Sequence, residues 1–301
     1  MRPVGLVLLA LFVGGATAQA EAPPTVKTFK DYRIEIDPVP PPAANADSPR
    51  PHQELRILRD GTVLARVANE RVDLYGGDLT DLDRKDKRNV VPVLGADVTG
   101  TGMPVAVVET YDGGAHCCTT LQLFALGPDF RPLGAIHGGN YPVRFRRMKG
   151  TPGLVAVIYD ETFAYWMASF ADSVAPEVLL AYDPQADDFR FNAALMRRPP
   201  PSAKTLKAEA DRVRRDPAWK RKGDDNVPPA LWDRMLALIY SGQAPLARDF
   251  LERAWAGKAD DRAGFWHDLV LCQLRRSIYW PNVAALNGWA PDKPAADCPT
   301  D

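Results

Sequence analysis

The pattern of hydrophobic positions changes near residue 200. From about residue 30 to residue 195, apolar residues form short runs separated by Gly, Asp and Pro, which is typical of β-strands joined by turns. After the proline run 199–201, apolar residues recur at intervals of three and four, which indicates amphipathic helices. The order of these patterns predicts an α+β protein, with a β-rich domain at 21–198 and a helical subdomain at 203–290.

Short connections organise the predicted strands. Parallel strands need long crossovers, so turns such as 60–61 and 127–128 predict an antiparallel β-meander, either propeller-blade-like or a sandwich. The expected strands are 32–37, 54–59, 62–67, 104–111, 119–125, 143–147, 154–159, 177–182 and 189–193. The expected helices are 203–215, 230–241, 245–256 and 262–277, followed by a tail at 291–301.

An internal repeat is suggested within the β-rich domain. The segment 100–108 aligns with 150–158, and each opens with Gly-Thr and continues into a valine-rich strand. Repetition at about 50 residues, with several short strands per unit, is typical of propeller blades. We therefore predict blade-like units at about 96–145 and 146–195, with chance similarity of two valine-rich strands as the alternative.

The opening of the first unit resembles an integrin-α-type FG-GAP (or VCBS) repeat. The resemblance lies in Ala96-Asp97-Val98-Thr99-Gly100-Thr101-Gly102-Met103-Pro104 and the valine-rich strand after it. In that family an Asp-rich loop binds Ca²⁺, which needs six to eight oxygen ligands. Asp97 matches the first ligand position, whereas Thr99, Thr101 and Val105 replace other expected ligands. The resemblance thus implies a retained turn and a lost calcium site.

A second distinctive segment is Gly113-Gly114-Ala115-His116-Cys117-Cys118-Thr119, where the first unit must turn. Adjacent glycines permit the positive φ angles of a tight hairpin. The segment is similar to strings in uncharacterised secreted bacterial proteins, a likeness that implies a shared structural device without a known activity. The segment 160–166 occupies the matching place in the second unit.

The N-terminus carries an export signal. Arg2, an apolar run at 4–13 and Ala18-Gln19-Ala20 are typical of a cleavable signal peptide at 1–20. The run is shorter than the roughly 20 residues that span a bilayer, and no longer run follows. We predict a periplasmic or extracellular protein without a transmembrane anchor. The formal net charge of −1 gives no electrostatic reason to expect nucleic acid binding.

Four cysteines offer either disulfides or a reactive site. Export and an even count favour disulfides, and spacing favours Cys272–Cys298, which leaves Cys117 and Cys118 to each other. One cysteine could instead be buried, or the pairs could cross. Alternatively, His116, Cys117 and Cys118 could form a soft copper or zinc site or a redox thiol. Candidate metal ligands are thus Asp97, His116, Cys117 and Cys118, with Met103 or His137 as a further ligand.

An aromatic group follows the strand at 154–159. Its members Tyr159, Phe163, Tyr165, Trp166 and Phe170 would either pack in the core or, with His116, present a ligand surface. The sequence contains no hydrolase, Walker or dinucleotide motif. We therefore expect a non-catalytic exported binding or structural module without a cofactor, whose partner is a small molecule, glycan or protein. The alternatives are the thiol or metal site and, ranked last, a carboxylate-based hydrolase.

Overall fold

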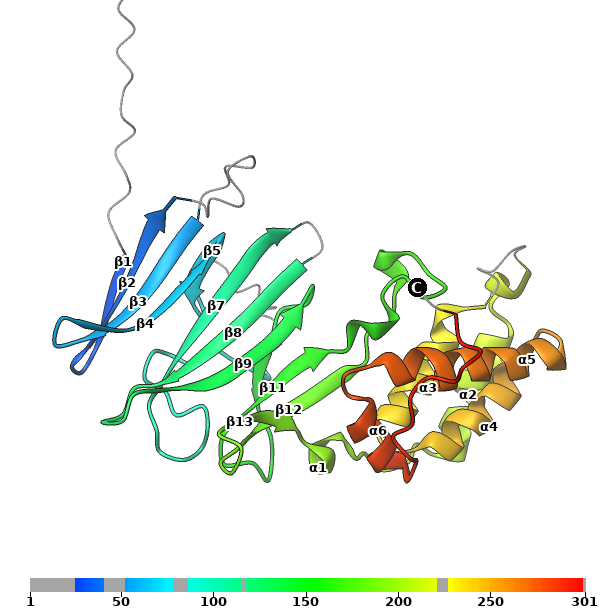
Figure 1. Cartoon of the computed structure of the whole chain (residues 1–301). Coiled ribbons are helices and arrows are strands. Elements are labelled where there is room, and N and C mark those ends of the chain that lie inside the picture. The colour runs from blue at the N-terminus through cyan, green and yellow to red at the C-terminus, as the bar shows by residue number, and fades with distance from the viewer. Residues whose placement is uncertain (1–24, 41–51, 78–85, 115–116, 221–226, 300–301) are drawn as a thin grey trace, which may run out of the picture.

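The computed structural model describes residues 25–40, 52–77, 86–114, 117–220 and 227–299. Three antiparallel sheets follow one another along the molecule, and a group of helices lies at the far end (Figure 1). The α+β prediction is confirmed. The export signal predicted at 1–20 lies outside the described residues.

Each sheet is a meander of neighbouring strands. The first sheet has the order β1-β2-β3-β4, formed by Thr25–Phe29, Tyr32–Val39, His52–Arg59 and Thr62–Asn69. The second has the order β5-β7-β8-β9, formed by Arg71–Leu74, Val105–Gly114, Cys117–Ala125 and Arg131–Gly139. The third has the order β13-β12-β11-β10-β6, formed by Asp188–Phe191, Glu177–Asp183, Leu154–Tyr159, Arg144–Arg147 and Asn89–Val90.

The second sheet is buried on both faces. Successive side chains of a strand point to opposite faces, and β7 is apolar at every position from Val105 to Val108. Ala106 and Val108 belong to a core shared with the first sheet. Val105 and Val107 belong to a larger core that includes the third sheet and the helices. The sheets are therefore packed face to face.

The two candidate repeat units touch through their opening loops. Leu154 N donates to Val98 O at 2.9 Å. Gly100 has a φ of +78°, and a Cβ there would lie 2.3 Å from the backbone of Pro152 and Gly153. Glycine is therefore required in this loop for both its conformation and its close contact. The repeat and the propeller interpretation themselves stay predictions.

The helices share one core with the third sheet. They are α1 (Ala193–Met196), α2 (Ala203–Arg214), α3 (Pro229–Tyr240), α4 (Ala244–Ala254), α5 (Ala259–Trp266) and α6 (Trp280–Asn287). The single helix expected at 262–277 is instead α5 continued by the π-helix η6 (His267–Gln273) and the short η7 (Leu274–Arg276). Helices α1 and α3 pack against β12.

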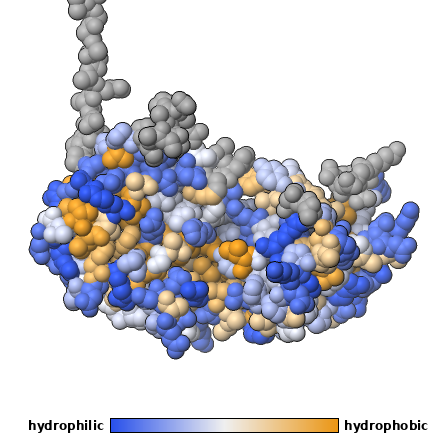
Figure 2. All heavy atoms as spheres, in the orientation of Figure 1, coloured by the Kyte–Doolittle hydropathy of each residue, from blue (hydrophilic) through white to orange (hydrophobic). Residues whose placement is uncertain are grey.

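Polar groups cover both ends of the stack. Ion pairs cover a face of the first sheet: Glu35 bonds Arg33 and Arg56, and Glu54 bonds Arg66 at 2.6 Å. A further apolar sheet is not expected to pack against such a charged face. At the other end, the helices bury the last sheet and present a mostly hydrophilic exterior (Figure 2). Both ends of the stack thus have a polar outer face, as the capping units of repeat proteins do.

Candidate functional site

The connection between β11 and β12 joins the third sheet to the helices. Asp160, which is 3% exposed, begins this connection. Its Oδ1 accepts from Thr162 N at 3.0 Å and from Thr162 Oγ1 at 2.6 Å. Its Oδ2 accepts from Tyr240 Oη at 2.5 Å and from Ser277 Oγ. One buried carboxylate therefore fixes the loop to both α3 and the turn before α6.

Two tyrosines near Asp160 keep their hydroxyl protons at neutral pH, and one of them, Tyr240, donates to it. Burial and the nearby Asp160 carboxylate raise the pKa of Tyr240 well above its ordinary value. The same causes raise the pKa of Tyr279 to about 12. The side chain of Asp160 is enclosed by donors that keep their protons, so its oxygens are occupied in holding the fold.

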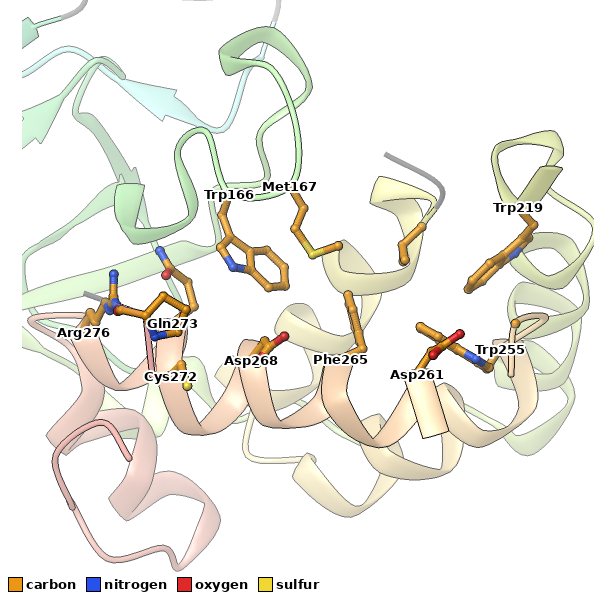
Figure 3. Close-up of a pocket in the computed structure, with 13 residues that line it drawn as sticks. Trp166, Met167, Trp219, Trp255, Asp261, Phe265, Asp268, Cys272, Gln273 and Arg276 are labelled. Atoms are coloured by element: carbon orange, nitrogen blue, oxygen red, sulfur yellow. The ribbon is translucent and has the colours of Figure 1, made fainter. Parts of the chain in front are cut away.

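Beyond Asp160, the connection enters a cavity of about 560 Å³ between the loop and the helices. Its principal walls are the rings of Trp166, Trp219, Trp255 and Phe265, which come from four separate segments (Figure 3). Concave, largely apolar cavities of 300–1,000 Å³ are typical of small-molecule sites. Size and lining therefore make this cavity the candidate functional site.

The aromatic walls form one continuous contact network. Trp166 lies 5.8 Å from Phe265, Phe265 lies 5.4 Å from Trp255, and Trp255 lies 4.9 Å from Trp219, measured between ring centroids. The indole N–H of Trp219 donates to Val213 O, and that of Trp255 donates to Lys258 O, both at 2.8 Å. These bonds fix two rings before any ligand arrives, which reduces the ordering cost of binding.

The backbone on either side of Trp166 is in the left-handed region. Tyr165 has a φ of +60° and Met167 a φ of +51°. For residues with a Cβ this conformation costs about 1–2 kcal/mol each. Strained backbone of this kind concentrates at ligand sites, where the surroundings hold it in place. Between these two residues, Trp166 points its indole into the cavity (Figure 3).

Charged groups line the cavity at separate points. Asp261 lies on α5, Asp268 on η6, and Arg276 at the end nearest the C-terminal tail. The two aspartates are seven residues apart on one continuous helical path, which is about 10 Å along its axis. The two carboxylates therefore do not form the close pair that a general acid and a general base would need. Asp261 has no ion-pair partner among the described residues.

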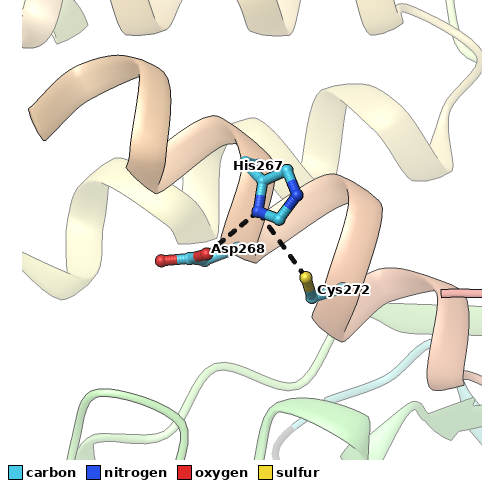
Figure 4. Close-up of side chains that lie close together, drawn as sticks. All are labelled: His267, Asp268 and Cys272. Carbon is cyan, nitrogen blue, oxygen red and sulfur yellow. Dashed lines mark hydrogen bonds and ion pairs between the residues drawn. The ribbon is translucent and has the colours of Figure 1, made fainter. Parts of the chain in front are cut away.

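A side-chain cluster on η6 resembles a metal site in composition only. His267 Nδ1 lies 3.2 Å from Asp268 Oδ1 and 3.7 Å from Cys272 Sγ (Figure 4). Cys272 is bonded to Cys298, so it offers no thiolate. On its other side, His267 Nε2 lies 3.2 Å from Asp297. The hydrogen bond with Asp268 and the charge of Asp297 raise the pKa of His267.

The C-terminal tail is fastened beside the cavity, as the spacing of Cys272 and Cys298 predicts. That disulfide is present, and Ala295 N donates to Leu271 O at 3.2 Å. Arg276 donates to Pro299 O, and Pro299 lines the cavity. The tail therefore forms part of the cavity wall.

The aromatic ligand surface predicted from sequence is divided between several places. Trp166 lines the cavity, whereas Phe163 is fully buried in the core. Tyr165 is 61% exposed and contacts Phe170. Tyr159 lines a second cavity of about 460 Å³ on another side of the loop. His116 lies outside the described residues, so its role stays a prediction.

The Cys-Cys hairpin has the predicted location. Gly114 pairs with Cys117 where β7 turns into β8. Cys118 is disulfide-bonded, while the side chain of Cys117 lies outside the described residues. His137, on β9, pairs with Thr120, two positions from Cys118. Met103 precedes the opposite end of β7, about 30 Å along the strand, so it cannot join a site at this turn.

The Asp97 loop closes on itself through backbone donors. Asp97 Oδ1 accepts from Thr99 N at 3.1 Å and Gly100 N at 2.7 Å, and Oδ2 accepts from Gly102 N at 2.7 Å. Burial raises the pKa of Asp97, but these hydrogen bonds outweigh it and the net shift is downward. N–H groups, rather than further carboxylates, surround this carboxylate.

Sequence reasoning missed three of the four principal rings, namely Trp219, Trp255 and Phe265. Trp219 precedes Trp255 by 36 residues and Phe265 follows Trp255 by ten, so no single local motif joins the three. A signal was nevertheless present, because all seven tryptophans lie between 166 and 289. None of them is among the exposed large apolar side chains of the described residues. This concentration indicates an aromatic-rich helical region.

Comparison with known proteins gives one partial likeness. The chain is 35% identical, over 160 residues, to a probable thylakoid lumen protein of Synechocystis sp.. The matched segment covers 46% of this chain and 45% of that protein, so the chain spans less than half of its relative's length. No known family matches the chain, and no solved structure matches it. Among the described helices, none has the length and apolar character needed to cross a bilayer.

Proposed function

We propose that this protein is an exported, non-catalytic binding protein whose ligand site is the aromatic cavity. The observation that carries the proposal is the set of aromatic rings from four segments, two of them fixed by hydrogen bonds, around one space of about 560 Å³. A cavity of this size holds a small organic molecule or a few residues of a peptide or glycan. Flat apolar faces of such a ligand would stack on the indoles.

Export is part of the proposal. It is supported by the predicted signal at 1–20, by the Cys272–Cys298 disulfide and by the likeness to a lumen protein. Disulfides of this kind persist in oxidising compartments outside the cytoplasm. The periplasm or the extracellular space provides such conditions. The three sheets would then be blade-like scaffolds that hold the helical subdomain.

The polar chemistry near the cavity favours binding over catalysis. Asp160 is occupied by four donated hydrogen bonds, and Glu161 accepts from Asn140 N at 2.5 Å. Asp261 and Asp268 are separated along the helix, as described above. A carboxylate-based hydrolase would need two carboxyl groups facing one substrate bond. The described residues of the cavity do not offer that arrangement.

The test is a binding screen with matched tryptophan variants. Trp219 and Trp289 are both half-buried, and each packs on a buried tryptophan, but only Trp219 lines the cavity. The purified mature protein would be titrated with a panel of aromatic, glycan, peptide and ammonium compounds while its tryptophan fluorescence is recorded. We expect saturable binding of at least one compound class, weakened tenfold or more by Trp219→Ala.

The control variant is Trp289→Ala, which we expect to bind as the wild type does. Circular dichroism would establish that both variants remain folded. If no panel compound bound, or if the two variants lost binding equally, the cavity would not be the ligand site.

A further inference from the structure

The cavity's lining also indicates the chemical class of the ligand, an inference that rests on the proposed function. The indole N–H groups of Trp219 and Trp255 donate to backbone carbonyls. These rings therefore offer the cavity their carbon faces and edges, without N–H donors. Gln273, a further polar residue of the lining, donates its amide hydrogen to Thr162 O. Three N–H donors of the lining are thus already used, whereas the Trp166 indole N–H has no hydrogen-bond partner among the described residues.

Two carboxylates line the cavity along the path of α5 and η6. They are Asp261 and Asp268, and in Figure 3 Asp261 is drawn at the end that holds Trp255 while Asp268 is drawn toward the middle. Asp268 is partly balanced by His267, whereas Asp261 has no ion pair among the described residues. The faces of Trp255 and Phe265 and the Asp261 carboxylate would therefore all attract a cation.

Three arginines around the cavity interact with other groups. Arg262 pairs with Glu252 at 2.8 Å. Arg214 donates to the backbone oxygens of Arg253 and Trp255. Arg276 lies at the opposite end and donates to Pro299 O. None of these three forms a described ion pair with Asp261.

We infer that the cavity binds an organic cation, an ammonium group with apolar substituents, at its Asp261 end. Aromatic faces attract such a cation through their quadrupoles, and the attraction grows when the cation is desolvated. The carboxylate adds charge pairing without demanding a fixed hydrogen-bond direction, which suits a substituted ammonium. A free amine, a quaternary amine or a lysine side chain of a peptide shares this chemistry.

The experiment compares two ligands of nearly equal shape. Choline carries a quaternary nitrogen, and 3,3-dimethylbutan-1-ol has a carbon atom in its place. Binding of each would be measured by tryptophan fluorescence at low and at physiological ionic strength. We expect choline to bind at least tenfold more tightly than the neutral alcohol, with a preference that decreases as salt is added.

Neighbouring aspartates provide matched variants. Asp260 and Asp261 both lie exposed in the first turn of α5, but only Asp261 lines the cavity. Asp261→Asn should reduce the preference for choline to threefold or less, and Asp260→Asn should leave it unchanged. A lysine-containing peptide and its acetyl-lysine form would then distinguish a peptide ligand from a free amine.

The outcomes separate the two proposals. If both ligands bound equally well, or if Asp260→Asn had the same effect as Asp261→Asn, the cation inference would be overturned. If neither bound while an uncharged compound of the panel did, that inference would again fail and the binding function would stand. If nothing bound, both would fail.

Discussion

Removing one hydroxyl from the Asp160 network should measure how strongly the loop is held to the helices. Tyr240 is 2% exposed and donates to a carboxylate that is 3% exposed. A hydrogen bond to a charged acceptor contributes about 1.5–3 kcal/mol. Tyr240→Phe removes this donor and leaves Asp160 with its other three hydrogen bonds. We therefore expect the free energy of unfolding to fall by about 2 kcal/mol.

A second tyrosine–aspartate pair supplies the control. Tyr182 donates to Asp187, whose side chain is 38% exposed and also bonds Arg131. Water can replace the lost hydroxyl there, so Tyr182→Phe should cost less than about 1 kcal/mol.

Urea unfolding would be followed by tryptophan fluorescence, which reports on residues 166–289, and by circular dichroism. The slope of the unfolding free energy against urea concentration should be equal for the wild type and the variants. If Tyr240→Phe and Tyr182→Phe lowered the free energy of unfolding equally, Asp160 would not be the buried group that holds the loop to the helices. A further check is Tyr240→Phe in an Asp160→Asn background, where the loss should be smaller because the charged acceptor is gone.

Three further predictions concern the loops and the tail. Gly100→Ala should destabilise the protein by about 2 kcal/mol more than Gly102→Ala in urea unfolding, because both have positive φ but only a Cβ at Gly100 meets neighbouring backbone; equal effects would contradict the loop contact. Replacing Cys272 and Cys298 by serine opens a link across 26 residues and should cost about 3–4 kcal/mol, with faster proteolysis of the tail; unchanged proteolysis would show that the disulfide does not hold the tail. The pKa of His267 is raised, so the pairing of protonated His267 should stabilise the tail fully below pH 6.5, and this stabilisation is lost as the pH rises through the raised pKa. Asp297→Asn should lower the pKa of His267, measured by NMR of the ring proton, and an unchanged pKa would exclude this pairing.

Strands with a regular apolar pattern could be predicted from the sequence, and those without one could not. The expected strands at 32–37 and 62–67 lie within β2 and β4. By contrast, β1 is an exposed edge strand with no buried alternation, and β9 contains Pro132 and three glycines. Their place in the sheets comes from pairing with distant strands, which a local pattern does not record.

The helical boundaries show the same distinction. The predicted helix at 203–215 corresponds to α2, because Ser202 caps it and an apolar stripe follows. Helix α6 is short, but its Pro281 in the first turn and its left-handed Gly288 at the end were signals available in the sequence. The change to a π-helix at His267 had no such signal.

The candidate site was the least predictable feature. Trp166 stood out because it followed a predicted strand in an aromatic-rich segment. Trp219 and Trp255 join it only through the tertiary packing of α2, α4 and α5. Spacing did predict the Cys272–Cys298 disulfide, since two cysteines 26 residues apart can close locally.

The most direct test of the ligand site is an NMR titration that observes the indole N–H signals of the seven tryptophans. During titration with benzyltrimethylammonium, we predict saturable shifts at Trp166, Trp219 and Trp255, which line the cavity. The signals of Trp280 and Trp289, which pack together elsewhere, should stay in place. Repeating the titration with the compounds of the panel would extend the test to uncharged ligands. Absence of saturable shifts at the three cavity tryptophans with every compound would contradict the account.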